Sequence, residues 1–346
     1  MRGRGAMTRV LRAVRGFLRR ARGGGGAAGE LRPDLVARLA CPITGDPLVH
    51  LPAERSLCGA GSALSYPVAG EIPLLLAHHA RRKDGRFEPP AAAGNGGEDR
   101  AAFAARYDAM IASPRMRALY DDSGYFNVGY WEAGVSDLAT ACEALVDRIA
   151  SAVPAGARSI LDVGCGIGAG TVRLQRLFPD ALVIGANVSA RQLAEARRRG
   201  VEACAAMDAT RLALLPESVD AVVSIEAAQH FDTRVDFFSE ALRVLRPGGA
   251  LVVADMLFTD PGPTGAGLLP PRNDVVTLPA YAEALERCGF ERVAVKDVKP
   301  VTWRPYCALL SEAFRDSPAV VPRLERSLAH YVIASARKPD APERQA

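Results

Sequence analysis

The sequence has no apolar run that approaches the ~20 residues of a membrane-spanning helix. Its seven cysteines are odd in number and scattered, which argues against a disulfide framework and favours reduced thiols in a cytoplasm. A basic excess is also missing from most of the chain. Residues 1–30 hold eight arginines and one acid, and the other 35 basic and 38 acidic residues give a net charge of −3. Nucleic acid is therefore not an expected partner.

Residues 1–30 form a basic arm. Its apolar side chains fall on one helical face and arginines fill the other, a pattern that can bind an anionic surface or a partner. The Arg-rich, acid-poor composition would also suit an organellar transit peptide, whereas the apolar core of a secretory signal is missing. Because Gly23–Gly26 uncouples the arm from the rest of the chain, we expect it to be disordered.

Residues 31–80 read as a small unit of short strands and turns. The unit contains Cys41-Pro42, Pro47-Leu48, Tyr66-Pro67-Val68 and Ile72-Pro73. With these pairs in this order, it resembles the zinc-ribbon module of the tRNA-methyltransferase activator subunit. The resemblance implies four metal ligands, but Thr44 and Gly61 replace two of the cysteines, so we expect no metal. A docking role and a remnant held by its apolar core both stay open.

Residues 81–100 are rich in Gly, Pro and Ala and are expected to be a linker. From residue 101 to residue 346, apolar strands alternate with helices. The expected strands are Ser159–Val163, Leu182–Ala186, Glu202–Ala206, Ala221–Ile225, Ala250–Asp255, Glu291–Val298 and Tyr331–Arg337. The helices between them include Gly170–Phe178, Ala190–Arg199, Arg234–Val244 and Leu278–Cys288. This alternation predicts an α/β fold with a doubly wound, mostly parallel seven-stranded sheet, whose ligands bind at the carboxyl ends of the strands.

The first of these strands runs into the glycine-rich segment ILDVGCGIGAG, residues 160–170. Gly164-x-Gly166-x-x-Ala169 fits a dinucleotide turn, while Asp162-x-Gly164-x-Gly166-x-Gly168 fits a loop that holds S-adenosylmethionine (SAM). Asp162 stands where a dinucleotide loop is usually apolar, and an acid there can hold loop amides or, through water, a cationic amino group. The loop alone leaves both cofactors open.

Polar side chains follow the next two strands. Asn187, with Val188 after it, stands about 20 positions beyond the glycines, where an acid normally meets ribose hydroxyls. An amide still offers an acceptor and donors to a diol, although it lacks the charge. Asp208 can accept a hydrogen bond from an adenine amine, while Met207 and Ala209 flank the ring. The alternatives are an ordinary turn residue and an ordinary loop acid.

Three segments in this order and spacing are specific as a set: LDVGCGIG (161–168), LLPESVDAVVS (214–224) and VLRPGGALVVADM (244–256). With them, residues 105–337 resemble the class I SAM-dependent methyltransferases of the small-molecule type. The resemblance implies SAM as cofactor, with the glycine loop and Cys165 at its methionine part, Asn187 at the ribose and Asp208 at the adenine. Tyr125, Tyr130 and Trp131 look like the segment that covers the methionine end in this family, where aromatic faces attract the sulfonium.

The fourth strand ends in Ile225-Glu-Ala-Ala-Gln-His-Phe231, where a reacting group can face the ligand. Methyl transfer from a sulfonium is an in-line displacement in which the protein mainly positions the acceptor. A hydroxyl acceptor must also lose a proton, and a neutral His230 can take it, although a structural role is the alternative. Glu226 is expected to orient the substrate. His330 precedes the last strand and is expected away from the carboxyl ends.

We expect a small, partly apolar acceptor, methylated at oxygen in preference to nitrogen or carbon. A Gly/Pro loop at 257–274 and a helical insertion with Trp303, Tyr306 and Phe314 are candidates to shape its pocket. Three other hypotheses stay open: an rRNA or tRNA methyltransferase, a non-catalytic SAM-binding partner protein and a nicotinamide oxidoreductase. Methyl transfer to RNA would favour the first hypothesis, and a failure to bind SAM would favour the second. Binding of NAD would favour the third.

Overall fold

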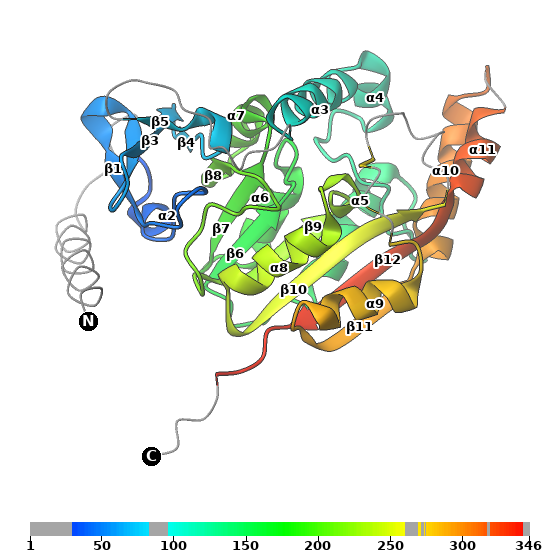
Figure 1. Ribbon diagram of the computed structural model, residues 1–346. Coiled ribbons are helices and arrows are strands. Elements are labelled where there is room, and N and C mark those ends of the chain that lie inside the picture. Colours follow the sequence, from blue (N-terminus) through cyan, green and yellow to red (C-terminus); the bar gives the residue numbers. More distant parts are fainter. Residues whose placement is uncertain are drawn as a thin grey trace.

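The computed structural model describes residues 30–82, 96–259, 269–270, 273, 275–316 and 319–341. The basic arm predicted at 1–30 lies outside these residues apart from Glu30, and so does most of the linker predicted at 81–100. Figure 1 shows a central twisted sheet with a small amino-terminal unit at one edge. Within the described ranges, no helix is both long and apolar enough to cross a membrane.

The central sheet has seven strands in the order β11-β12-β10-β9-β6-β7-β8. The strands are β6 (Ser159–Val163), β7 (Leu182–Asn187), β8 (Ala203–Ala206), β9 (Val219–Ile225), β10 (Leu245–Phe258), β11 (Glu291–Asp297) and β12 (Leu328–Arg337). All are parallel except β12, which pairs antiparallel with both β10 and β11. The predicted mostly parallel, doubly wound sheet is confirmed, and the apolar strand sequences fit burial on both faces.

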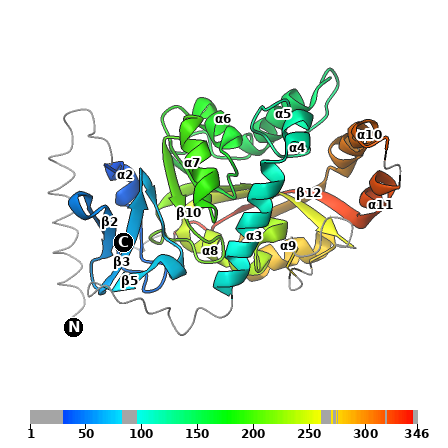
Figure 2. The same ribbon diagram turned by 90° about the horizontal axis from the view of Figure 1, so that it is seen from above.

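Helices cover both faces of this sheet, as the view from above in Figure 2 shows. One layer contains α5 (Leu138–Ala150), α6 (Ala169–Leu177) and α7 (Ala190–Arg198), and the other contains α8 (Arg234–Val244) and α9 (Leu278–Arg287). Side-chain caps fix where they start. Asp137, Ser189 and Thr277 each accept a backbone N–H at a helix start, and Thr233 forms a capping box with Asp236.

The chain reverses its direction of travel across the sheet between β6 and β9, which pair with each other. Strands β6, β7 and β8 run outward to one edge, and β9 and β10 run toward the other, where β12 is inserted between β10 and β11. At such a switch point the connections leave in opposite directions and open a crevice at the carboxyl ends of the strands. Two helices, α3 (Gly96–Ile111) and α4 (Pro114–Leu119), precede the sheet, and α3 crosses above it (Figure 2). A further pair, α10 (Trp303–Ala313) and α11 (Val320–Ser327), is inserted before β12.

The amino-terminal unit is a small antiparallel sheet that packs on the β8 edge of the large one. It consists of α2 (Pro33–Val36), β1 (Leu48–Leu51), β2 (Ser56–Gly59), β3 (Leu64–Ala69), β4 (Ile72–Pro73) and β5 (Arg81–Arg82). Leu75 donates its backbone N–H to Ala206 O at 2.7 Å, and Ala40 donates to Ala213 O at 3.0 Å. Leu35, Leu57 and Tyr66 belong to the same apolar cluster as buried residues of β6 to β10. The unit therefore protects an edge strand that would otherwise be open to pairing.

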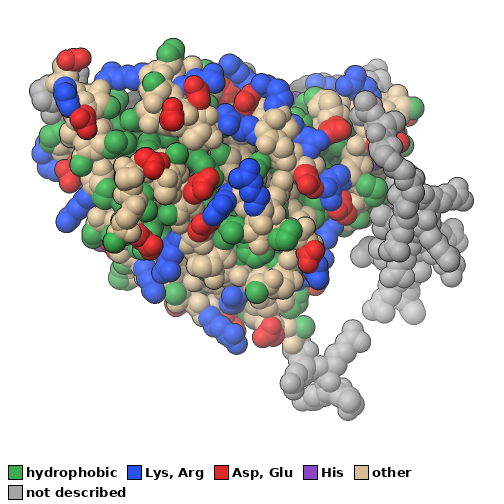
Figure 3. Space-filling view, turned by 180° about the vertical axis from the view of Figure 1, so that it is seen from behind, with side chains coloured by type: hydrophobic (Ala, Val, Ile, Leu, Met, Phe, Trp, Pro, Cys, Tyr) green, Lys and Arg blue, Asp and Glu red, His purple; other side chains and the backbone are tan. Residues whose placement is uncertain are grey.

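The two motif cysteines of this unit are buried side chains. The Cys41 thiol lies 3.2 Å from the Tyr66 hydroxyl and accepts the N–H of Thr44 at 3.4 Å. Among the described residues, no group of three or more His, Cys, Asp or Glu is arranged to hold a metal. On the face in Figure 3, basic and acidic side chains are interspersed over the described part of the chain.

Candidate active site

A cavity of about 470 Å³ opens at the carboxyl ends of β6, β7, β8 and β9, beneath α3. It brings together most of the residues singled out from the sequence. Those that line it are Asp162, Gly164, Cys165, Gly166, Asn187, Val188, Met207, Asp208, Ala209, Ile225, Glu226, His230 and, upstream of the sheet, Tyr125. Residues from four strand ends therefore surround one space, as the switch-point argument requires.

The glycine loop forms one wall of this cavity. Gly164 has φ +81°, and a Cβ there would lie 2.3 Å from the Cβ of Ala227, so the position excludes any side chain. Gly166 has φ +56°, and a Cβ on it would meet nothing within 4 Å. Gly168 does not line the cavity: its α-carbon packs against Ala196, where a Cβ would approach within 2.7 Å. The loop thus exposes bare backbone to a ligand and packs its last glycine against a helix.

Asp162 lies at the end of β6 and is 4% exposed. The hydroxyl of Thr171 donates to its carboxylate at 2.6 Å. Burial raises the pKa of Asp162 to about 6, and the hydrogen bond from Thr171 opposes that rise. Beside it, burial also raises the pKa of the Cys165 thiol well above its ordinary value, so this side chain is a neutral filler of the loop.

The end of β7 carries a chain of hydrogen bonds. Asn187 donates from Nδ2 to Oε1 of Gln192 at 3.1 Å and accepts the N–H of Ser189 at 3.0 Å. Gln192 also lines the cavity, although its sequence position inside α7 gave no indication of it. At the next strand end, Asp208 accepts the N–H and the hydroxyl of Thr210, both at 2.9 Å. These hydrogen bonds hold the side chains in place at the cavity wall.

Glu226 follows β9 and has a left-handed backbone, with φ +53°. Its side chain reaches the cavity but is only 8% exposed, and its Oε1 accepts the N–H of Val128 at 2.8 Å and the hydroxyl of Tyr331 at 2.6 Å. Burial raises the pKa of Glu226 to about 7, while the two hydrogen bonds limit the rise. A left-handed non-glycine residue at a strand end is strained, which is common where a side chain must be aimed.

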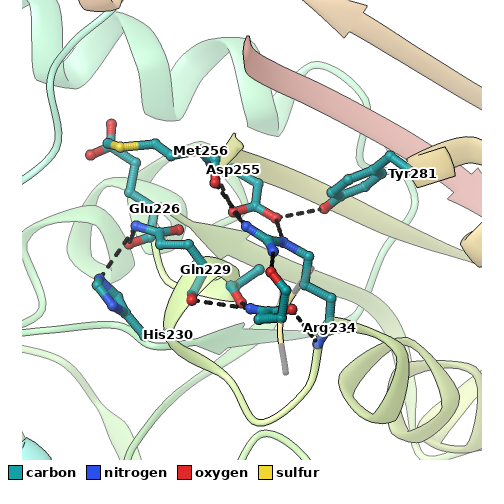
Figure 4. Close-up of polar contacts among 9 residues, drawn as sticks. Glu226, Gln229, His230, Arg234, Asp255, Met256 and Tyr281 are labelled. Atoms are coloured by element: carbon teal, nitrogen blue, oxygen red, sulfur yellow. Dashed lines mark hydrogen bonds and ion pairs between the residues drawn. The ribbon is translucent and has the colours of Figure 1, made fainter. Parts of the chain in front are cut away.

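His230 lies four residues further along, at the end of a short 3₁₀ turn. Its ring centroid lies 5.5 Å from that of Phe103 and 5.3 Å from that of Tyr107, both on α3. The amide of Gln229 lies 3.4 Å from Nε2 of His230, as Figure 4 shows. The imidazole is therefore covered by two aromatic rings on the side of α3 and faces the cavity.

A buried ion pair supports the His230 loop from behind (Figure 4). Nε of Arg234 lies 2.7 Å from Oδ2 of Asp255, and these side chains are 3% and 0% exposed. Tyr281 donates its hydroxyl to the same carboxylate at 3.0 Å. Arg234 also bonds to the backbone carbonyl of Asn273, whose side-chain amide donates to Gln229 O at 3.0 Å. The network thus connects β10, α9 and the segment around residue 273 to the loop.

Several residues expected near the ligand lie elsewhere. Tyr130 and Trp131 are outside the cavity lining and pack against an apolar cluster, with the indole N–H bonded to Val128 O at 2.9 Å. Trp303 and Tyr306 are buried in that same cluster. His330, by contrast, was expected away from the carboxyl ends of the strands, and this prediction is wrong. Because β12 runs antiparallel, His330 near its start pairs with Leu257 near the carboxyl end of β10. Phe314 is likewise outside the lining.

The lining residues on α3 were not anticipated from the sequence, whereas the loop after β10 was a candidate to shape the pocket. Phe103, Arg106 and Tyr107 come from α3, and Leu269 and Pro270 come from the loop after β10. The i, i+4 spacing of the two aromatic residues places them on one helical face. That spacing gives no indication of which sheet edge the helix will cover.

Comparison with known proteins agrees with this geometry. The family described as "Methyltransferase domain" matches residues 161–253. The chain is 30% identical over 261 residues to erythromycin 3''-O-methyltransferase of Saccharopolyspora erythraea, an alignment that covers 64% of this chain and 85% of the relative. It is 31% identical over 252 residues to 27-O-demethylrifamycin SV methyltransferase of Amycolatopsis mediterranei, with coverages of 61% and 89%.

Among solved structures, geranyl diphosphate C-methyltransferase from Streptomyces coelicolor A3(2), in complex with Mg²⁺, a substrate analogue and S-adenosyl-L-homocysteine, has the same fold. The TM-score is 0.59 at 20% identity, and the match covers 72% of this chain and all of the other. The strand order, the glycine loop at the switch point and the curated relatives agree. The chain belongs to the class I SAM-dependent methyltransferase family and is an enzyme that uses SAM as its methyl donor.

Proposed function

We propose that this enzyme methylates a hydroxyl group on a small, partly apolar acceptor of specialised metabolism. The observation that carries the proposal is the position of His230, which faces the cavity from the end of β9 beneath two aromatic rings. Phe103, Tyr107 and Phe126 make this end of the cavity apolar, while Glu226 adds a polar group. The names of two relatives support oxygen as the methylated atom, because both refer to O-methyl positions on natural products.

The residues that would hold SAM form the other end of the same cavity. The bare backbone at Gly166 leaves room that a side chain would fill, and buried Asp162 lies beside it. We assign this wall to the methionine part, Asn187, Val188 and Gln192 to the ribose, and Met207, Asp208 and Ala209 to the adenine. When bound, SAM supplies an electrophilic methyl group on a sulfonium. Tyr125 and Ile225 also line the cavity and would exclude water from the reacting atoms.

We assign the proton transfer to His230. Histidine is the side chain whose ordinary pKa lies nearest neutrality, so its neutral imidazole can accept the proton that the acceptor hydroxyl loses. Glu226 is held by Val128 and Tyr331 through one carboxylate oxygen, and we assign to it the orientation of the acceptor. Positioning and proton removal together are what this chain must provide for O-methylation.

The His230→Ala variant tests this proposal. With labelled SAM and a panel of hydroxylated natural products that includes 27-O-demethylrifamycin SV, turnover of any acceptor found should fall about 10²–10⁴-fold. Binding of S-adenosylhomocysteine, measured by calorimetry, should stay within about twofold. His330→Ala is the matched control, because this histidine pairs with Asp297 at 2.6 Å outside the cavity lining. Unchanged turnover in His230→Ala would exclude the proton-accepting role.

The remaining sequence-based assignments stay proposals. A degenerate zinc ribbon at residues 31–80 is supported by the buried Cys41 and Tyr66 at its motif positions. Division into an arm, this unit, a linker and a catalytic domain is supported by the strand pattern, although the unit shares an apolar cluster with the large sheet. A cytoplasmic location is supported by the seven free cysteines.

A further inference from the structure

Asp108 connects α3 to the segment that follows β7. Its Oδ1 accepts a hydrogen bond from the hydroxyl of Ser189 at 2.8 Å and another from Nε2 of Gln192 at 2.7 Å. Ser189 is 4% exposed and Gln192 is 5% exposed, so little water competes for these donors. Hydrogen bonds to an ionised acceptor are about twice as strong as neutral ones. The two bonds therefore attach α3 to the first turn of α7.

The same bonds fix the direction of the Gln192 amide. A carboxylate can only accept hydrogen bonds, so Nε2 of Gln192 faces Asp108 and Oε1 remains to accept from Asn187 at 3.1 Å. Asn187 and Gln192 both line the cavity. Position 187 itself carries no charge. The negative charge is supplied by Asp108, which is connected to Asn187 through the side chain of Gln192.

The same helix also contacts the candidate proton acceptor. Phe103 and Tyr107 precede Asp108 on α3 and place their rings 5.5 Å and 5.3 Å from that of His230. One helix therefore covers the candidate proton acceptor with its aromatic residues and holds the strand end at β7 with its aspartate. Any displacement of α3 changes both contacts at once.

We propose that Asp108 is a positioning residue that couples cofactor binding to closure of the acceptor site. The inference rests on the proposed location of the ribose at Asn187 and Gln192. A ribose that fixes Gln192 stabilises the bond to Asp108 and holds α3 over His230, so the cofactor binds first and the acceptor site is complete afterwards. The coupling is reciprocal, because a closed α3 must strengthen cofactor binding by the same factor that the cofactor stabilises closure.

The experiment uses the full chain with S-adenosylhomocysteine as the probe. Amide hydrogen exchange over residues 102–111 and the dissociation constant are measured for the wild type, Asp108→Ala and Asp108→Asn. We expect the probe to slow exchange in the wild type. Asp108→Ala should bind about tenfold more weakly and lose this added protection. Asp108→Asn should retain most of it, because the amide oxygen can accept both bonds. Asp180→Ala is the control, since its carboxylate is 81% exposed and bonds only to Arg158 among the contacts described.

Each outcome decides the inference. If Asp108→Ala binds the probe like the wild type, or binds it weakly while exchange in α3 still responds to it, the coupling is refuted. If Asp108→Ala unfolds, Asp108→Asn decides alone, and it must keep the protection from exchange that the probe adds. Loss of that protection in an Asp108→Asn variant of unchanged thermal stability also refutes the coupling. A wild type that does not bind the probe contradicts the proposed cofactor site instead, so the two failures are distinct.

Discussion

The hydroxyl of Tyr331 on β12 donates a hydrogen bond of 2.6 Å to Oε1 of Glu226, at the end of β9. The backbone N–H of Val128 donates to the same oxygen at 2.8 Å. Two segments far apart in the sequence therefore fix a carboxylate that is almost fully buried. Burial disfavours the charged carboxylate, and the two hydrogen bonds offset this cost only in part. Glu226 therefore favours its protonated form more than an exposed glutamate does.

The Glu226→Gln variant should change how stability depends on pH. Burial raises the pKa of Glu226 from 4.5 to about 7, so its stabilising contribution is present below pH 4.5 and is lost as the pH rises through 7. A glutamine keeps both hydrogen bonds and does not ionise. From about pH 5 to about pH 8 the variant should gain about 2–3 kcal/mol relative to the wild type. Urea unfolding at both pH values measures this gain, and Glu286→Gln on the exposed face of α9 should show none.

Restoring an acid at the ribose position should weaken cofactor binding. In Asn187→Asp, a carboxylate would face Oε1 of Gln192, which now accepts from Asn187 at 3.1 Å, and would lie near the charge of Asp108. Two acceptors cannot bond, so the Gln192 amide must turn and lose Asp108. We expect about tenfold weaker binding of S-adenosylhomocysteine by calorimetry. Tighter binding in Asn187→Asp would show that the amide network is dispensable.

Replacing Gly164 by alanine should destabilise the fold and the cofactor site together. The residue has φ +81°, and a Cβ would lie 2.3 Å from that of Ala227. Left-handed backbone and overpacking add to about 2–4 kcal/mol in the free energy of unfolding. Gly170→Ala is the comparison, because a Cβ there first meets Val146 at 3.7 Å. That helical substitution should stabilise by about 0.5–1 kcal/mol, and an equal loss in both variants would contradict the assigned strain.

The sequence predicts the sheet well because most of its strands, such as β7 and β9, are apolar runs bounded by turns. The helix Arg234–Val244 has the predicted bounds, since the capping Thr233 and Asp236 mark its start. The strand-end residues follow from topology alone: once the sheet is parallel, Asp162, Asn187 and Glu226 must meet at one edge. Local pattern and fold agree at these positions.

The parts that could not be predicted depend on contacts between distant segments. Nothing local to Phe103 or Asp108 indicates that α3 will cross the carboxyl ends of the strands. The prediction for His330 is wrong because the direction of β12 is a tertiary property that an apolar strand pattern does not contain. Trp131 was predicted at the ligand because aromatic faces attract a sulfonium. In the structure, its indole N–H instead donates a hydrogen bond to Val128 O.

The buried pair of Arg234 and Asp255 should behave as a unit. Removing either partner breaks a buried ion pair, and we expect Arg234→Met or Asp255→Leu to cost about 3–5 kcal/mol each. The double variant should cost clearly less than the sum, because the two side chains interact directly and the pair is removed once. Urea unfolding of the four proteins gives this coupling energy. Turnover should fall in all three variants, since Arg234 also holds the Asn273 segment that bonds to the His230 loop.

The exposed pair of Arg287 and Glu283 on α9 provides the matched comparison. Its side chains are 62% and 63% exposed, at the i, i+4 spacing. Solvent screens such a pair, so the same double-variant cycle should give about 0.3–0.5 kcal/mol and leave turnover unchanged. A coupling energy at Arg234 and Asp255 no larger than this would mean that the buried network does not hold the loop.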